Sequence, residues 1–235
     1  MFIYPVAPPM NTPDATQRLN TALESLLPAG VRHATSRIPA RPIFRFQAEA
    51  KAMRTAGDYR QSEFVAGRDC ARAALAQIGY PEQPILADAD GVPAWPAGAL
   101  GAISHSRGYC GAVAARQTDY RILGLDLEKT NRLSRAAIER VVHPQEQGYV
   151  EGDQRKASLI FSAKEAFFKA QYPSWQTHAN FHDLVLAVEG SDIGRMTIRD
   201  LAQRFPDDLC ALAPDIRFRF RYFEDFVVTL CWMEQ

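Results

Sequence analysis

The stretch GLDLE, residues 124–128, decides the fold of this chain together with the stretch FSAKEAFFK, residues 161–169. Apolar residues alternate through the first stretch and the residues before it, which predicts a β-strand. Alternate side chains of a strand share a face, so the leucines of this strand point into a core. Asp126 and Glu128 then lie on the opposite face, about 7 Å apart, and both carboxylates can approach one cation.

The second stretch is predicted to be a helix, because apolar residues recur at helical spacing from residue 159 to residue 170. Ser162, Glu165 and Lys169 lie together on another side of it, and Glu165 and Lys169 form an i,i+4 pair. Three acidic groups with lysines between them suit a Mg²⁺ that grips a phosphate ester. Either stretch alone is more often a solvated strand end or an amphipathic helix with a surface ion pair. Only the combination is specific.

Together, the two stretches resemble the signature motifs of the 4'-phosphopantetheinyl transferases, of the large monomeric type that serves siderophore, nonribosomal peptide and polyketide synthases. These motifs are G-[IV]-D-x-E and [FW]-x-x-K-E-[AS]-x-x-K. Every fixed position is present, apart from Leu125 standing where Ile or Val is commoner. The resemblance implies an α+β fold of two similar lobes related by a pseudo-twofold axis, with the active site between them. We place the boundary near Tyr120, so that residues 1–120 and 121–235 form the two lobes.

A further motif, R-x-x-E-F-x-x-G-R-x-x-A-R, lies on a helix predicted over residues 58–78. At about 100° per residue, Arg60 and Arg68 fall within about 80° of each other, so both can face one ligand. Arginines on a helix are ordinarily solvated, but this segment resembles the helix that the family uses against coenzyme A. The resemblance implies that Arg60 and Arg68 meet its phosphates, with Arg72 a weaker candidate, and guanidinium geometry suits that task.

The segment W-P-x-G-x-x-G-x-I-S-H-S, residues 95–106, leads into a strand predicted over residues 109–115. A lone histidine in such a place is more often structural. The segment again resembles the family, in which the matching histidine contacts a coenzyme A phosphate and the preceding serine lies beside it. The resemblance implies that Ser104 and His105 bind the coenzyme, with His105 acting as a hydrogen-bond donor or a cation.

The chain departs from the family in the loop before this motif. Members often carry a lysine there, whereas no lysine occurs between residues 80 and 105. Ala87 and Val92 stand where it would be expected. One expected phosphate contact therefore has no assigned residue, and Arg45 or Lys51 could supply it.

The resemblance implies transfer of 4'-phosphopantetheine from coenzyme A to a serine of an apo acyl, peptidyl or aryl carrier protein, with release of adenosine 3',5'-bisphosphate. Asp126, Glu128 and Glu165 would hold Mg²⁺, or Mn²⁺ in its place, against the pyrophosphate. Glu165 is the candidate base for the serine proton, directly or through a metal-bound water. Lys169 would balance charge on the reacting phosphate, so it joins Asp126 and Glu165 in the catalytic set. Lys164, about 100° around the helix from Glu165, is a further candidate contact to the coenzyme.

Two other functions remain open. A Mg²⁺-dependent phosphohydrolase acting on nucleotides would cleave phosphate esters without a protein acceptor. A non-catalytic carrier-protein binder could have kept the fold, but it would be free to lose the carboxylates and Lys169, which are intact. After the second stretch, residues 172–175 could wall an apolar tunnel for the pantetheine arm, although we expect them to be core.

Composition limits the class of protein. Lys and Arg total 27, as do Asp and Glu, so the net charge of zero gives no argument for a nucleic-acid or membrane partner. No apolar run is long enough to span a bilayer, and the start of the chain lacks the pattern of a signal peptide. The four cysteines are scattered, which fits reduced thiols in a cytoplasm.

Outside these motifs, periodicity and turn signals predict helices over residues 15–27 and 134–142. The C-terminal part is predicted to be rich in strands, at residues 183–188, 196–201, 216–222 and 226–232.

Overall fold

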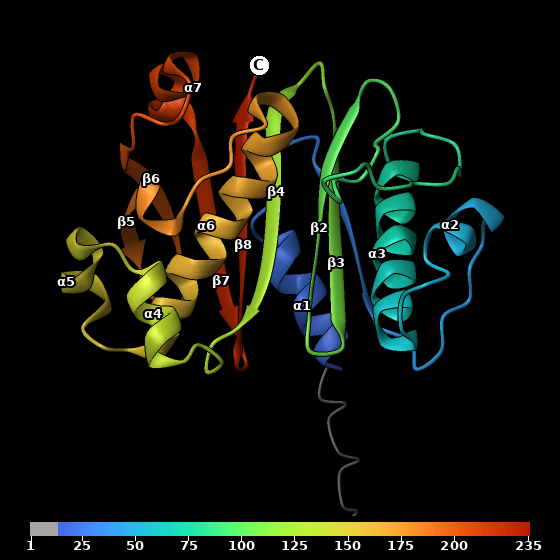
Figure 1. Cartoon of the computed structure of the whole chain (residues 1–235), viewed down its shortest axis with the longest axis horizontal. Coiled ribbons are helices and arrows are strands. Elements are labelled where there is room, and N and C mark those ends of the chain that lie inside the picture. Colours follow the sequence, from blue (N-terminus) through green and yellow to red (C-terminus); the bar gives the residue numbers. More distant parts are fainter. Residues whose placement is uncertain (1–13) are drawn as a thin grey trace, which may run out of the picture.

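The computed structural model describes residues 14–235, whose strands form two antiparallel sheets (Figure 1). One sheet has three strands in the order β1-β3-β2, and the other has five in the order β4-β8-β7-β6-β5. The strand bounds are β1 Arg32–Arg37, β2 Ala99–Ser106, β3 Tyr109–Arg116, β4 Tyr120–Lys129, β5 Leu184–Gly190, β6 Ile193–Leu201, β7 Arg217–Phe223 and β8 Phe226–Glu234.

Helices cover both sheets and confirm the predicted α+β class. The α-helices are α1 Ala15–Glu24, α2 Gln47–Ala52, α3 Asp58–Ala76, α4 Arg135–Val141, α5 Gln147–Val150, α6 Gln154–Trp175 and α7 Asp207–Leu212. Short 3₁₀ helices are η1 Pro144–Glu146, η2 Phe181–Asp183 and η3 Ala213–Asp215. Among residues 14–235, no helix is long and apolar enough to cross a membrane.

Helix α3 packs on the three-stranded sheet through small side chains. Cys70, Ala71 and Ala74 of α3 are buried in one cluster with Cys110 and Ala112 of β3. Small residues on both surfaces allow the helix to approach the strands closely, so the interface is densely packed without large side chains. This packing fixes the distance between the sheet and the polar face of α3, which carries Arg60.

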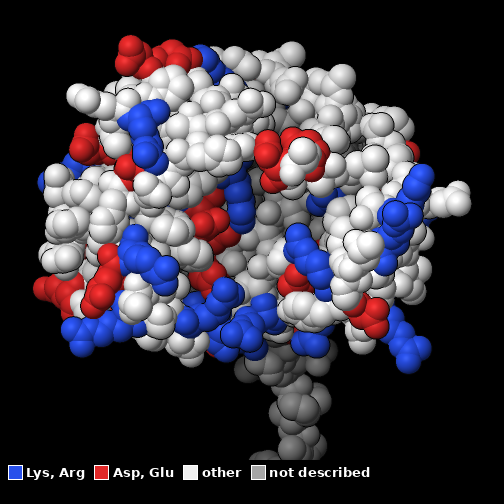
Figure 2. Space-filling model, viewed as in Figure 1, with Lys and Arg blue, Asp and Glu red and all other residues white. Residues whose placement is uncertain are grey.

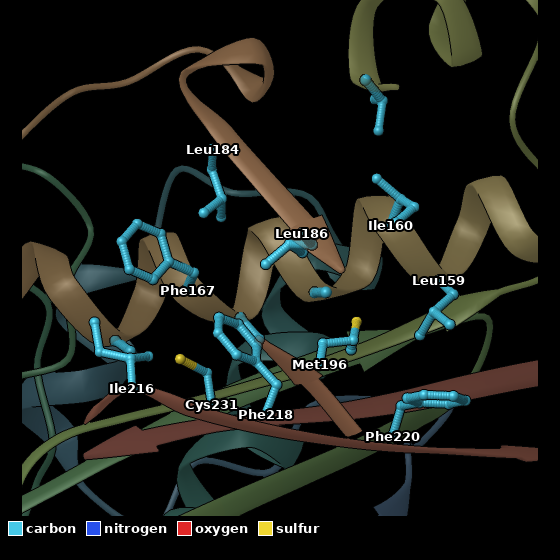
Figure 3. Packing of buried hydrophobic residues seen from close by; sticks show 14 of the residues in the cluster. Leu159, Ile160, Phe167, Leu184, Leu186, Met196, Ile216, Phe218, Phe220 and Cys231 are labelled. Carbon is cyan, nitrogen blue, oxygen red and sulfur yellow. The ribbon is translucent and has the colours of Figure 1, made fainter. Parts of the chain in front are cut away.

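Helix α6 is the long helix of the five-stranded half. Asp153 caps its N-terminus by accepting hydrogen bonds from the backbone N–H groups of Arg155 and Lys156. Its apolar face packs against β5, β6, β7 and β8, as Figure 3 shows for Phe167 and the residues around it. The other face lies on β4 at Gly124, where a Cβ would come within 1.9 Å of the carbonyl oxygen of Ala166. Only glycine permits this approach.

A third cluster joins the two sheets. Leucines of α1 pack there with Val113 of β3, Leu125 of β4 and Leu230 of β8. In Figure 1, β2 and β4 lie next to each other at the centre, with α3 and α6 on either side. The chain passes from one sheet to the other between the end of β3 and the start of β4, close to the boundary expected near Tyr120. The exact division into lobes remains a prediction.

Several elements differ from the sequence-based expectations. The helices predicted over residues 15–27 and 58–78 are shorter, because their last residues form turns. Strand β1 and helix α2 were not predicted. Residues 99–106, expected to lead into a strand, are themselves strand β2, which forms a hairpin with β3. The four C-terminal strands are present, with shifted ends.

Candidate functional site

A cleft of about 550 Å³ opens between the two halves of the molecule. Figure 2 shows this face hollowed at its centre, with basic and acidic side chains gathered along the hollow. Helix α3 and strand β2 supply one wall, the loop after α3 supplies part of the rim, and the end of α6 supplies the other wall. The polar lining includes Arg60, Glu63, Arg68, Asp90, His105, Lys169, Tyr172 and His178.

Lys169 connects this cleft to Asp126. Its Nζ donates to Asp126 Oδ1 over 2.6 Å and to Ser104 Oγ over 3.1 Å. Ser104 Oγ also donates to Asp126 Oδ1 over 2.9 Å and accepts from the backbone N–H of Leu127 over 3.1 Å. The Ser104 hydroxyl is therefore fully used within the protein, where it ties β2 to β4 and orients Asp126. The expected contact between Ser104 and the coenzyme stays a prediction.

Asp126 is nearly buried, with 6% of its side chain exposed. Its second oxygen, Oδ2, is buried and has no hydrogen-bond partner among the described residues. A buried carboxylate oxygen without a partner is costly, since it has lost its hydration. Asp126 Oδ2 therefore keeps an unused capacity to accept one more positively charged or hydrogen-bonding group.

Two further carboxylates lie near Asp126. Burial raises the pKa of the Glu165 carboxyl; Lys169 opposes the shift, and the carboxylates of Asp126 and Glu128 add to it. Burial also raises the pKa of Glu128, against the effects of the Lys129 backbone N–H and of Arg132. The three carboxylates therefore influence one another electrostatically, as their predicted grouping requires.

These carboxylates do not converge on a single point. Among residues 14–235, no group of three His, Cys, Asp or Glu side chains is arranged so that it could hold a metal ion. Lys169 occupies one oxygen of Asp126, and Glu128 turns towards the Lys129 N–H at 2.7 Å and Arg132 at 3.5 Å. Like charges in a partly buried site repel one another unless a cation lies between them. The predicted metal site therefore stays a prediction.

Arg60 and His105 meet at the opposite wall. Arg60 Nη1 lies 3.1 Å from His105 Nε2 and 3.2 Å from Glu63 Oε2. Burial lowers the pKa of His105; Glu63 opposes this, while Arg60 and Lys169 add to it. Burial and the neighbouring Arg60 and Lys169 disfavour the charged form of His105, so of the two roles expected for it, hydrogen bonding fits this environment better than a permanent cation.

Arg68 also borders the cleft. Its guanidinium lies over the ring of Phe64, 4.2 Å from the ring centre, and its Nε donates to the carbonyl oxygen of Ile85. Burial lowers the pKa of Arg68 to about 10, so the side chain keeps its charge at neutral pH. Its place in the lining beside Arg60 matches the predicted pair of arginines.

Lys164, expected to contact the coenzyme, is not part of the lining of the cleft. It is fully buried and forms an ion pair with Glu146 at 2.7 Å. Its other two protons go to the carbonyl oxygens of Val141 and Phe181. All three donors of the ammonium group are used inside the protein, and none is left for a ligand.

Arg72, the weaker candidate, is also turned away. Its guanidinium is held by Glu49 at 2.6 Å and Asp69 at 2.7 Å, with 5% of its side chain exposed. It fastens α2 to α3. Arg45 is engaged by Asp69 and Glu82, and neither Arg45 nor Lys51 belongs to the described lining, so the structure adds no support for either in place of the missing lysine.

Residues 172–175 divide between the two roles considered for them. Tyr172 and Pro173 line the cleft, whereas the expected position in the core holds only for Trp175, which packs against the core around α6. His178 supports Tyr172, with 3.0 Å between its Nε2 and the tyrosine hydroxyl. Glu63 is the glutamate of the arginine motif, but no role was predicted for it. An acidic residue is not expected in a site that binds an anion.

Comparison with known proteins identifies two matching family models. The model described as the 4'-phosphopantetheinyl transferase N-terminal domain matches residues 48–115, and that of the 4'-phosphopantetheinyl transferase superfamily matches residues 122–231. These ranges contain all the motifs described above. Every site residue discussed here lies within one model or the other, except Arg45.

Individual relatives agree with these models. The chain is 37% identical over 186 residues to 4'-phosphopantetheinyl transferase Svp from Streptomyces mobaraensis, covering 75% of each protein. It is 34% identical to 4'-phosphopantetheinyl transferase PptT from Mycobacterium tuberculosis, covering 57% of this chain and 61% of the relative. It is 33% identical to enterobactin synthase component D from Escherichia coli, covering 54% of this chain and 62% of the relative.

Solved structures match less closely. A complex of a holo-acyl-carrier-protein synthase with coenzyme A, described as from Chronobacterium ammoniagenes, covers 48% of this chain and 97% of its own. Its TM-score is 0.35 at 20% identity, and a likeness this low supports no comparison of the two sites.

Proposed function

Because the chain belongs to the 4'-phosphopantetheinyl transferase superfamily, it is an enzyme that transfers phosphopantetheine from coenzyme A to carrier proteins, and we propose how its residues share that work. The observation that carries the proposal is the position of Lys169. It borders the cleft between the two halves and at the same time holds the buried carboxylate of Asp126. A phosphate in the cleft and the acidic cluster would meet at this lysine.

Coenzyme A is proposed to lie in the cleft, with its phosphates against the basic groups of both walls. Arg60 and Arg68 come from α3, His105 from β2 and Lys169 from α6. Guanidinium groups bind phosphate oxygens through paired hydrogen bonds, and an ammonium group balances their charge. The cleft volume of about 550 Å³ is within the usual range for ligand-binding clefts.

Asp126, Glu128 and Glu165 are proposed to hold Mg²⁺, or Mn²⁺ in its place. Three observations support the fit: Asp126 Oδ2 is buried without a partner, and the pKa values of Glu128 and Glu165 are both raised by burial and by neighbouring carboxylates. A divalent cation would remove each of these penalties, and carboxylates with phosphate oxygens are the ligands that Mg²⁺ prefers. When bound, it would polarise the pyrophosphate and stabilise charge on the leaving group.

In the proposed reaction, the hydroxyl oxygen of the carrier serine attacks the phosphorus that bears the pantetheine arm. The bond from this phosphorus to the bridging oxygen breaks, and adenosine 3',5'-bisphosphate leaves with that oxygen. The serine proton passes to the carboxylate of Glu165. Lys169 balances the negative charge of the transferred phosphate.

The carrier proteins are proposed to be peptidyl, aryl or acyl carriers of secondary-metabolite synthases, including siderophore synthases. Relatives named for a siderophore synthase component support this choice. A monomer is proposed because the basic and acidic walls of the site come from one chain. A cytoplasmic location is proposed because all four cysteines are free thiols.

The proposal is tested by intact-mass spectrometry of apo carrier proteins incubated with the enzyme, coenzyme A and Mg²⁺. We expect the carrier to gain one phosphopantetheine group, and we expect EDTA to prevent the gain. The Glu165→Gln variant should lose at least about a hundredfold in rate, the usual contribution of a general base, while its thermal midpoint stays close to that of the wild type. Transfer by this variant at the wild-type rate would refute the role of Glu165.

The same samples separate the alternatives. Breakdown of coenzyme A or nucleotides without a gain of mass on a carrier would indicate a phosphohydrolase. Coenzyme A binding without turnover on a peptidyl, an aryl and an acyl carrier would indicate a non-catalytic binder.

A further inference from the structure

An acidic side chain lies in the basic wall of the cleft. Glu63 is part of the lining between Arg60 and His105, and 13% of its side chain is exposed. A carboxylate at this place repels the phosphates that the wall is proposed to bind. Unless it contributes something else, its presence lowers the affinity of the site for an anion.

The contacts of Glu63 show what it contributes. Its two carboxylate oxygens bind different partners: Oε1 lies 3.2 Å from His105 Nδ1, and Oε2 lies 3.2 Å from Arg60 Nη1. The same Arg60 nitrogen lies 3.1 Å from His105 Nε2. The three side chains therefore form a closed triangle, which spans from α3 to β2.

This triangle determines where the histidine proton lies. A guanidinium group only donates hydrogen bonds, so His105 Nε2 must accept from Arg60. The proton of the neutral ring is then on Nδ1, from which it is donated to Glu63. Burial, which lowers the pKa of His105, agrees with a neutral ring.

The triangle also leaves one edge of Arg60 available. Both contacts use Nη1, and for Nε and Nη2 no protein partner is found among the described residues. These two nitrogens lie side by side on one edge of the planar guanidinium, the geometry that binds two phosphate oxygens at once. Because 59% of the Arg60 side chain is exposed, it would otherwise sample many rotamers.

We propose that Glu63 is a positioning residue, which holds Arg60 and His105 in the one arrangement that presents the free edge of Arg60 to a phosphate of coenzyme A. The proposal rests on the proposed function for the identity of the ligand. It does not require Glu63 to contact the ligand. The repulsion that Glu63 adds is outweighed by the fixed orientation of Arg60.

The proposal is tested by calorimetric titration of coenzyme A into the enzyme, with Mg²⁺ and without a carrier protein. The deciding result is whether Glu63→Ala strengthens or weakens the binding of coenzyme A. Electrostatic repulsion alone predicts that Glu63→Ala binds coenzyme A more tightly. We expect binding to weaken about tenfold, the effect of losing charge-assisted hydrogen bonds that order an arginine. Glu63→Gln keeps an acceptor oxygen and should weaken binding by only about threefold. Equal or tighter binding by Glu63→Ala would overturn the proposal.

Kinetics distinguish positioning from a general loss of structure. The KM for coenzyme A should rise in parallel with the dissociation constant, while kcat and the thermal midpoint change little. In an Arg60→Ala/His105→Ala background, Glu63→Ala should no longer weaken binding, because the groups it orients are gone. Continued weakening there would contradict the proposal. Glu139→Ala is the matched control, since Glu139 pairs with Arg135 at 3.2 Å on the exposed face of α4.

Nitrogen-15 spectra of the histidine rings test the triangle without any ligand. His105 should carry its proton on Nδ1 in the wild type and shift towards Nε2 in Glu63→Ala, with His105→Asn identifying the signal. A wild-type His105 protonated on Nε2 would overturn the assignment. If the wild-type enzyme binds no coenzyme A, the proposed function is at fault, and the spectra still decide the role of Glu63.

Discussion

Helix α6 carries two lysine–carboxylate pairs of nearly equal length in opposite environments. Lys164 and Glu146 are 2.7 Å apart and fully buried. Lys169 and Asp126 are 2.6 Å apart, with 33% of the Lys169 side chain exposed. We call them the interior pair and the cleft pair. Their lysines are five residues apart, about 140° around the helix, so one faces the core of its own half and the other faces the second sheet.

The difference lies in how completely each pair is satisfied. The interior lysine donates to three protein oxygens, and Glu146 also accepts from the backbone N–H groups of His143 and Leu186. The cleft lysine also has three acceptors, but Asp126 keeps one buried oxygen without a partner, and Lys169 borders open space. A closed network stabilises the fold, whereas an open one is available for a ligand. Two lysines of one motif therefore have separate tasks.

The largest loss of stability is expected when the interior pair loses its lysine. Lys164→Met leaves Glu146 buried without its charge partner, which costs about 3–5 kcal/mol of unfolding free energy. Urea unfolding followed by circular dichroism measures the change. Lys156→Met is the control, because its pair with Glu151 is exposed and should be worth less than about 1 kcal/mol. Similar losses in both variants would mean that burial does not distinguish the interior pair.

A smaller effect is expected where α6 rests on β4. In Gly124→Ala the new methyl group would clash with the carbonyl of Ala166 and the side chain of Ala170. Overpacking of this kind costs about 1–3 kcal/mol. The helix must move away from β4, which lengthens the cleft pair and leaves the interior pair intact. We therefore expect weaker transfer together with a lowered thermal midpoint. Full activity in a destabilised variant would show that the cleft pair tolerates this movement.

The cleft pair should affect activity more than stability. Lys169→Met removes the charge that is proposed to balance the reacting phosphate, and kcat/KM should fall about a hundredfold. Its unfolding free energy should fall by about 1 kcal/mol, because solvent reaches Lys169 and Ser104 still donates to Asp126. Steady-state transfer assays and urea unfolding measure the two quantities. A stability loss as large as that of Lys164→Met would remove the contrast between the pairs.

The smallest effect is a change in the pH dependence of stability. The folded state raises the pKa of Glu165 above its ordinary value of 4.5, so it binds this proton more tightly than the unfolded chain does. Unfolding free energy from this group therefore falls as pH rises from 4.5 through the raised pKa. Glu165→Gln should flatten this part of the profile, measured as thermal midpoint against pH without metal. An unchanged slope would mean that Glu165 is not in the repulsive environment described here.

Much of the site could be predicted from the sequence. The strand carrying Asp126 and the helix carrying Glu165 and Lys169 follow from periodicity, and the family follows from the motifs on them. The fate of each lysine could not be predicted. The position of a residue on a helix gives only its angle around the axis. Lys164 and Lys169 are the same residue type, so the sequence does not show which of them is buried. Which of them is covered depends on segments far along the chain, such as the one that supplies the carbonyl of Phe181.

Glu63 illustrates the same limit at the basic wall. Its distance of three residues from Arg60 is a local property, and an ion pair between them is an ordinary expectation for a helix. His105, however, lies 42 positions beyond Glu63 and reaches it only because α3 packs on the sheet that contains β2.

The sequence by itself determined the class of elements, the family and the chemical types available at the site, because short-range periodicity and motif letters are properties of neighbouring residues. Only the tertiary structure decided which charged groups are satisfied inside the protein and which are open to a ligand. Burial and hydrogen-bond partners come from contacts between distant segments. Lys164, Ser104 and Arg72 were drawn into the protein by such contacts, while Lys169, Arg60 and Arg68 were left at the cleft.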